Sequence, residues 1–216
     1  MRICVMIPIG PGHAEMAKQA VRSVMAANKA ESVNVAVAYE GDPDGKKGRS
    51  VTRNSLLRLA GPSDWLFWLD ADDLMAPDAF RGFLAALEAD PSLDAVWGQI
   101  AEWRGPEHPP LIRDPQVYPA SYRELIQADP FRSLNMGYFV RASVQAQEPW
   151  REDLNAGEDF DMYLRLWKGY RCAKVQTPFM LNRRGFHSQG PKSATPGEWR
   201  RAALGMLAEA RQAEGL

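Results

Sequence analysis

The chain has 216 residues, of which 45% are hydrophobic and 25% are charged, and its formal net charge is −1. These values are typical of a soluble globular protein that folds as one large domain. A net charge this close to zero argues against a nucleic-acid binder with a basic surface throughout, and leaves only local basic patches open. No apolar run has the length of a membrane span, and Pro8 and Gly10 interrupt the N-terminal run, unlike in a signal peptide. We therefore expect a cytoplasmic protein, with peripheral attachment to a membrane left open.

The first forty residues have the pattern of a strand, a helix and a second strand. Residues 3–7 form an apolar run that predicts a buried strand, which Pro8 and a glycine-containing turn end. From about residue 14 to 28 the apolar positions follow helical spacing, and residues 33–39 are a valine-rich run typical of a strand. This order predicts a parallel pair of strands with a right-handed crossover.

An acidic turn at residues 40–45 leads into a basic segment. The positive charges of that segment are Lys46, Lys47, Arg49 and Arg53. They lie where the loop after a strand meets a phosphate in an open α/β sheet, and a solvated basic loop is the alternative interpretation. Ser50 is the expected N-cap of a short helix that reaches about residue 60.

The next strand is followed at once by acids. Large apolar residues fill positions 65–69 and predict a strand buried on both faces, and Asp70, Asp72 and Asp73 come directly after it. Ligands of open α/β sheets bind beyond the carboxyl ends of such strands. Carboxylate oxygens suit Mg²⁺ and Mn²⁺, and Mg²⁺ commonly shares its ligand shell with substrate phosphates. The motif predicts a divalent metal that holds a phosphorylated substrate, with a solvated acidic turn as the alternative.

The second half of the chain is less regular. Its expected elements are a helix that begins at Pro77 and Asp78 and stops before Pro91, a strand at 94–103, a proline-rich loop at 104–119, a short helix near 122–126, a strand at 137–141, a helix at 158–168, a strand at 172–177, a basic loop at 182–195 and a terminal helix at 197–214. Strands and helices that alternate in the first half predict an α/β domain with a mostly parallel central sheet flanked by helices.

Two further groups of residues are chemical candidates. Glu158 and Asp159 open a helix whose apolar stripe fixes it to the core, so an ionised carboxylate there can face a cleft as a general base. Acids in a first helical turn are also common for helix-dipole reasons alone. Arg183, Arg184 and His187 follow the last strand, where arginine suits phosphate and histidine suits a metal or a diphosphate, or where they form plain surface.

The order and spacing of these motifs are more specific than any one of them. The relevant residues are Ile7-Pro8, Arg53-Asn54, Leu69-Asp70-Ala71-Asp72-Asp73, Gly157-Glu158-Asp159-Phe160-Asp161, Arg165-Leu166, Lys168-Gly169-Tyr170 and Arg184 to Ser188. Together they extend from about residue 2 to 190. In this arrangement the chain resembles family 2 glycosyltransferases of the GT-A fold.

The resemblance implies inverting transfer of a sugar from a UDP- or GDP-type nucleotide-diphosphate donor to a hydroxyl acceptor, with Mn²⁺ or Mg²⁺ as the cofactor. Asp70 and Asp72 match the DxD motif of the family, and His187 lies where some relatives supply a further metal or diphosphate contact. Asp159 matches the catalytic base, with Glu158 beside it. The other donor-binding candidates that the resemblance implies are Pro8, Glu40, Asp42, Arg53 and Arg184.

The resemblance also implies a division of the chain. About residues 1–103 correspond to the nucleotide-sugar half, about 104–195 to the acceptor half, and 196–216 to a C-terminal helix. Only twelve residues separate Glu40 from Arg53, where the family has another helix and strand, so we expect a shortened nucleotide-binding half and leave the base open. The alternatives are a non-catalytic sugar-nucleotide-binding module, against which the intact Asp159 argues, and a haloacid dehalogenase-like phosphatase, which places its DxD after the first strand.

Overall fold

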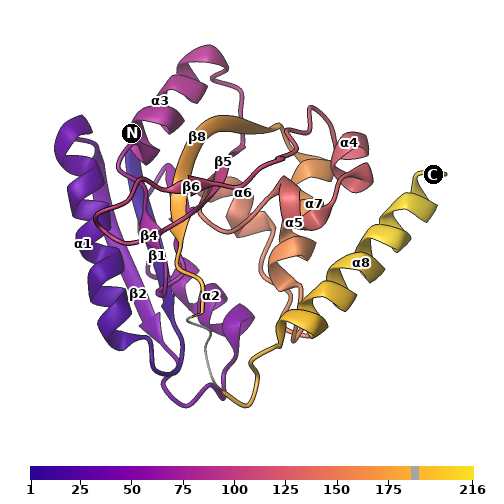
Figure 1. The fold of residues 1–216 in the computed structure, drawn as a ribbon, viewed down its shortest axis with the longest axis horizontal. Coiled ribbons are helices and arrows are strands. Elements are labelled where there is room, and N and C mark those ends of the chain that lie inside the picture. The colour runs from indigo at the N-terminus through magenta and orange to yellow at the C-terminus, as the bar shows by residue number, and fades with distance from the viewer. Residues whose placement is uncertain (186–189) are drawn as a thin grey trace.

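A mixed sheet runs through the centre of the computed structural model, which describes residues 1–185 and 190–216 (Figure 1). Within these residues the sheet has eight strands in the order β2-β1-β3-β7-β5-β8-β4, with β6 paired to β5. The strands are β1 (Arg2–Ile9), β2 (Asn34–Gly41), β3 (Trp65–Trp68), β4 (Leu74–Met75), β5 (Ala95–Glu102), β6 (Leu111–Ile112), β7 (Tyr138–Arg141) and β8 (Cys172–Asn182). The predicted α/β domain with a central sheet is confirmed.

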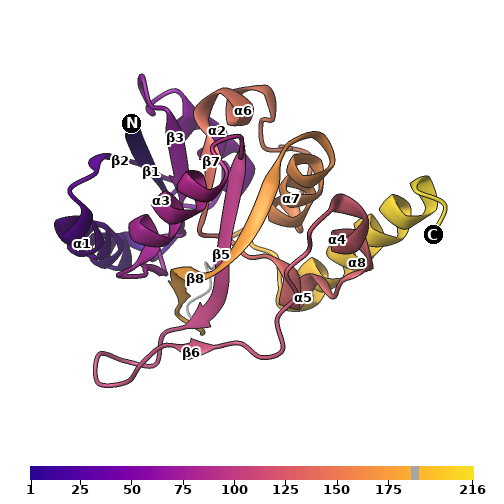
Figure 2. The same ribbon diagram turned by 90° about the horizontal axis from the view of Figure 1, so that it is seen from above.

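Helices pack around this sheet and differ in the part of the molecule they cover. They are α1 (Ala14–Glu31), α2 (Arg49–Leu57), α3 (Ala79–Ala89), α4 (Tyr122–Gln127), α5 (Pro130–Ser133), α6 (Ala142–Gln147), α7 (Glu158–Gly169) and α8 (Pro196–Ala213). α1 contacts β4 and α3, whereas α8 contacts α4 and α7. In both views α1 lies at one end of the molecule and α8 at the other (Figure 2). No helix in the described part of the chain is long and apolar enough to cross a membrane.

The first three long strands form a parallel group. β1 is parallel to β2 and to β3, with Ile3 opposite Val35 on one side and Trp65 on the other. Every residue of β3 is buried, as its continuous apolar run predicts. Because the three strands are parallel, their carboxyl ends meet at one edge of the sheet, where the acidic turn after β3 also lies.

The second half of the sheet is less parallel than the sequence pattern predicts. β7 runs antiparallel between β3 and β5, and β4 and β6 are antiparallel to β8 and β5, while β5 and β8 are parallel. The physical reason is that an apolar run marks a strand but not its direction, which is set by tertiary pairing, here that of β7 with both β3 and β5.

Three boundaries also differ from prediction. α2 begins at Arg49 after Gly48, which has a φ of 88°, so Ser50 lies within the helix and is not its N-cap. β8 extends past residue 177 because it pairs with β5 as far as Asn182 opposite Glu102. The expected loop at 104–119 contains β6, which pairs with the end of β5.

Aromatic side chains fill the core between the sheet and α3. The ring of Phe139 on β7 stacks on that of Phe83 at 4.0 Å between centroids, and it also contacts Phe67 and Phe179. These four rings come from β3, α3, β7 and β8, and they lock the antiparallel half of the sheet to the parallel half.

Candidate active site

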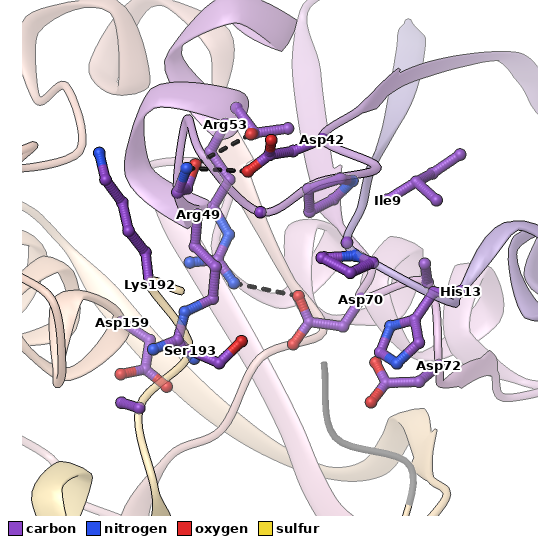
Figure 3. Close-up of a pocket in the computed structure, with 18 of the residues that line it drawn as sticks. Ile9, His13, Asp42, Arg49, Arg53, Asp70, Asp72, Asp159, Lys192 and Ser193 are labelled. Carbon is purple, nitrogen blue, oxygen red and sulfur yellow. Dashed lines mark hydrogen bonds and ion pairs between the residues drawn. The ribbon is translucent and has the colours of Figure 1, made fainter. Parts of the chain in front are cut away.

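A cleft of about 200 Å³ lies where β1 and β3 end and where α2 and α7 begin (Figure 3). Its walls come from the segments 8–13, 42–53, 70–73, 158–159, 182–183 and 192–194. It therefore lies beyond the carboxyl ends of the parallel strands, which is the place where the acids after β3 predict a ligand site.

Asp70, Asp72 and Asp73 form an acidic cluster in this cleft, with one carboxylate oxygen of each within 4.8 Å of the others. A tight turn brings them together, because the backbone N–H of Asp73 donates to the carbonyl of Asp70 at 3.0 Å. Burial and the charge of Asp70 raise the pKa of Asp72 to about 7, and burial and the charge of Asp72 raise the pKa of Asp73. A cation among these oxygens would offset their repulsion, so the cluster fits a hard divalent metal.

The end of β8 holds the acidic turn in place. The carboxylate of Asp73 accepts hydrogen bonds from the Arg183 backbone N–H at 2.7 Å and from the Asn182 amide at 3.2 Å. The Arg183 guanidinium is buried and donates to the backbone carbonyl of Asp72 and to the Gln19 side chain. Arg183 therefore both lines the cleft and supports the acidic turn through hydrogen bonds.

Arg53 joins the acidic turn to α7. Its side chain is only 3% exposed, and its guanidinium donates to Asp70 Oδ1 at 3.1 Å and to Glu158 Oε1 at 2.8 Å. The guanidinium carbon lies 4.5 Å from the ring centroid of Trp150. Arg53 and Asp70, two of the predicted donor-binding residues, thus form one hydrogen-bonded group with Glu158, the acid beside the predicted base.

Glu158 is a buried carboxylate whose Oε1 is shared by two arginines. Besides the Arg53 contact, it pairs with Arg49 Nε at 3.2 Å. Its side chain is 2% exposed, and its second oxygen, Oε2, is buried without a hydrogen-bond partner among the described residues. Glu158 is therefore fixed towards the arginines of α2.

Asp159 is partly buried in the same cleft and is held from the other side. Trp199 of α8 donates its indole N–H to Asp159 Oδ1 at 2.6 Å. Burial and the charge of Glu158 raise the pKa of Asp159 to about 6, although the Trp199 hydrogen bond opposes the shift. Figure 3 shows Asp159 and Asp72 on either side of Arg49 and Asp70. The carboxylate is positioned and titrates in the range of a general base.

Two of the predicted donor-binding acids lie at the end of β2 and in the loop between β2 and α2. Asp42 lines the cleft, and its carboxylate accepts the backbone N–H groups of Lys47 and Gly48 at 3.2 and 2.8 Å, which fixes the loop before α2. Glu40 pairs with Lys47 at 2.9 Å and is outside the lining of the cleft. Pro8, predicted from the end of the first strand, lines the cleft.

The site residues that the sequence predicted after β8 are not all found in the cleft. Arg184 forms an ion pair with Glu102, is 66% exposed and is outside the lining of the cleft. His187 lies outside the described residues. Of the predicted site, the structure thus gathers Pro8, Asp42, Arg53, Asp70, Asp72, Glu158 and Asp159.

Some cleft residues carry no motif that could have been recognised in the sequence. Lys192 lines the cleft because the segment 190–194 packs against the loop before α2, where a Cβ on Gly45 would lie 3.0 Å from the Gly190 Cα. Trp199 reaches Asp159 from forty residues away along the chain. Arg49 belongs to the basic segment that the sequence singled out. Only the fold shows that Arg49 lines the cleft whereas Lys46 is exposed to solvent.

The parallel strands, the acidic turn after β3 and the acids at the start of α7 together are the arrangement of a GT-A-type glycosyltransferase fold. No protein-family model and no curated protein matches the sequence. Solved structures do match. TarS 1–349 from S. aureus, in complex with UDP-GlcNAc, has a TM-score of 0.66 at 13% identity, over 96% of this chain and 66% of that chain.

Two further matches are a mannosyltransferase and a glycosyltransferase. The mannosyltransferase PcManGT from Pyrobaculum calidifontis, in complex with GDP-Man and Mn²⁺, has a TM-score of 0.52 at 16% identity, over 86% of this chain and 59% of that chain. A glycosyltransferase involved in the glycosylation of the major capsid of PBCV-1 has a TM-score of 0.50 at 14% identity, over 86% and 94%. The chain spans 60% of the TarS 1–349 structure determined with UDP. At these identities the likeness establishes the fold, and the predicted GT-A-type fold is confirmed.

Proposed function

We propose that this protein is an inverting, metal-dependent glycosyltransferase of the family 2 type, which transfers a sugar from a UDP- or GDP-sugar to a hydroxyl acceptor. One observation carries the proposal. A metal-suited acidic cluster and a positioned carboxylate, Asp159, line the same cleft. The buried Arg53 links the two, because it bonds Asp70 of the cluster and Glu158, the residue next to Asp159.

The acidic cluster serves the donor side. Asp70 and Asp72 are the residues that would hold Mn²⁺ or Mg²⁺, and a bound divalent cation supplies compensation for the charge that develops on a departing diphosphate. Arg49 and Lys192 add positive charge to the same cleft, and both suit phosphate oxygens. The structures of TarS with UDP-GlcNAc and of PcManGT with GDP-Man and Mn²⁺ support a donor of this class.

Asp159 serves the acceptor side. At neutral pH a carboxyl group with a pKa of about 6 is mostly ionised and can still accept a proton more readily than an ordinary aspartate. It takes the proton of the acceptor hydroxyl while that oxygen attacks the anomeric carbon, and the leaving diphosphate departs from the opposite face. The trajectory is direct, so no bond between sugar and protein forms and the anomeric configuration inverts.

The direct test is turnover of a panel of UDP- and GDP-sugars with Mn²⁺. Product is followed by mass spectrometry, and the anomeric configuration of the first-formed sugar product by ¹H NMR. We expect a product of inverted configuration from one donor and loss of turnover in EDTA. A product of retained configuration would exclude the role of Asp159 as the base that activates an in-line attack.

A non-catalytic sugar-nucleotide-binding module is the second candidate, and the short connection between β2 and α2 favours it. Glu40 at the end of β2 is outside the lining of the cleft, and the Asp42 carboxylate in the connection accepts two backbone N–H groups. This candidate predicts nucleotide binding without consumption of any donor.

A further inference from the structure

Glu158 lies next to the proposed base, and its environment is that of an ion-pair partner. The Oε1 atom is 2.8 Å from Arg53 and 3.2 Å from Arg49, and the side chain is almost wholly buried. A carboxylate that takes a proton from an acceptor must approach that acceptor, whereas this one is held between two guanidinium groups of α2. The ion pairs with Arg49 and Arg53 therefore define the role of Glu158.

Arg53 connects Glu158 to Asp70. One guanidinium nitrogen binds Glu158 and another binds Asp70 Oδ1, so the two carboxylates share one guanidinium group. The guanidinium cannot turn away, because it is packed against the Trp150 ring and has almost no exposed surface. Trp150 is itself fixed by Asn54 of α2, whose amide group exchanges two hydrogen bonds with the Trp150 backbone at 2.9 Å each.

On the basis of the proposed function, we infer that Glu158 is a positioning residue for the metal site, which acts through Arg53 on Asp70. With Glu158 in place, Arg53 is shared, and Asp70 is oriented with one oxygen held and the other available to a cation. Without it, the charge of Arg53 falls on Asp70 alone, which makes Asp70 a poorer ligand. The Arg53 bridge also ties Asp70 after β3 to Glu158 at the start of α7, and so sets the distance between the acidic cluster and Asp159.

The test is Mn²⁺ affinity, measured by electron paramagnetic resonance of free Mn²⁺ in the presence of UDP or GDP. We expect Glu158→Gln to raise the Kd for Mn²⁺ by about ten- to a hundredfold, as for other residues that orient a metal ligand. Glu158→Asp keeps the buried charge but shortens its reach, and should also raise the Kd. Arg53→Lys keeps the positive charge but cannot bridge two carboxylates in this geometry, and should resemble Glu158→Gln.

Glu102→Gln is the matched control. Glu102 is also a carboxylate paired with two arginines, Arg113 and Arg184, but it lies outside the lining of the cleft. This variant should keep the wild-type Mn²⁺ affinity, which separates positioning from a general change in charge. Thermal unfolding of each variant identifies any that fail to fold. If Glu158→Gln does not fold, Glu158→Asp, which keeps the buried charge, remains the informative variant.

The outcomes separate this inference from the proposed function. If the wild type binds no Mn²⁺ with either nucleotide, the metal-dependent function is wrong. If the wild type binds Mn²⁺ and the three variants bind it equally well, the positioning role alone is wrong. Loss of sugar transfer in Glu158→Gln with unchanged Mn²⁺ affinity would instead make Glu158 a group that acts on the acceptor.

Discussion

At Asp159 the environment of one carboxyl group determines how the protein should respond to pH. Burial and the charge of Glu158 raise its pKa to about 6, and a base acts only in its deprotonated form. The value of kcat/KM should therefore be constant above about pH 7 and fall by about tenfold per unit below pH 6. Measurement at saturating Mn²⁺ from pH 5 to 8 checks this. A profile that stays level down to pH 5 would contradict the assignment.

Replacing Asp159 by Asn separates catalysis from binding. The amide oxygen can still accept the Trp199 indole N–H, so the local structure should persist. We expect sugar transfer to fall by about 10²- to 10⁴-fold, the usual contribution of a general base, with nucleotide binding unchanged. Transfer at the wild-type rate would show that another group is the base.

The same substitution has a consequence for stability. The folded-state pKa of Asp159 is raised above its ordinary value of 3.8, so the folded protein binds this proton more tightly than the unfolded chain does. The corresponding stabilisation is present below about pH 4 and is lost as pH rises through about 6. Asp159→Asn should therefore unfold at a temperature no lower than the wild type at pH 8, as measured by calorimetry.

Among the elements, α8 contributes a hydrogen bond to the site. Trp199 is the donor that lowers the pKa of Asp159 against the effect of burial. Trp199→Phe keeps an aromatic ring next to Phe131 and Phe160 but removes the N–H. The midpoint of the acidic limb of the pH profile should therefore move to higher pH. A midpoint that is unchanged would mean that α8 supports Asp159 by packing alone.

The pairing of β5 with β8 depends on a glycine. A Cβ on Gly98 would lie 2.5 Å from the Thr177 carbonyl oxygen and 2.6 Å from the Phe179 nitrogen, both of which are backbone atoms. We expect Gly98→Ala to lower the free energy of unfolding by about 1–3 kcal/mol, as overpacking does. Gly205→Ala in α8 has open space and should raise it by about 0.5–1 kcal/mol. Denaturant unfolding of the two variants provides the comparison, and equal effects would contradict the packing argument.

At the scale of the whole molecule, local signals predicted the parallel half of the fold well. Continuous apolar runs marked β1 and β3, and helical spacing marked α1, α3 and α7, because burial on both faces or on one face leaves a direct pattern in the sequence. The position of β7 between β3 and β5 left no such pattern. Strand order is set by tertiary packing, such as the stacking of Phe139 on Phe83.

The site divides in the same way. The acids after β3 and at the start of α7 were predictable, since each follows a recognisable element. Their connection through Arg53 was not, because it joins residues 105 positions apart. Nor were the positions of Lys192, which lines the cleft, and of Trp199, which donates to Asp159, because both come from the last segment of the chain.

The central claim is that the acidic cluster holds a metal that in turn holds a nucleotide diphosphate. The most direct measurement is calorimetric titration of the protein with UDP and with GDP, in Mn²⁺ and again in EDTA, alongside Asp72→Asn. We predict that one nucleotide binds in Mn²⁺, and that its binding is lost both in EDTA and in the Asp72→Asn variant. Equal binding in Mn²⁺ and in EDTA would show that the acidic cluster does not hold the nucleotide through a metal.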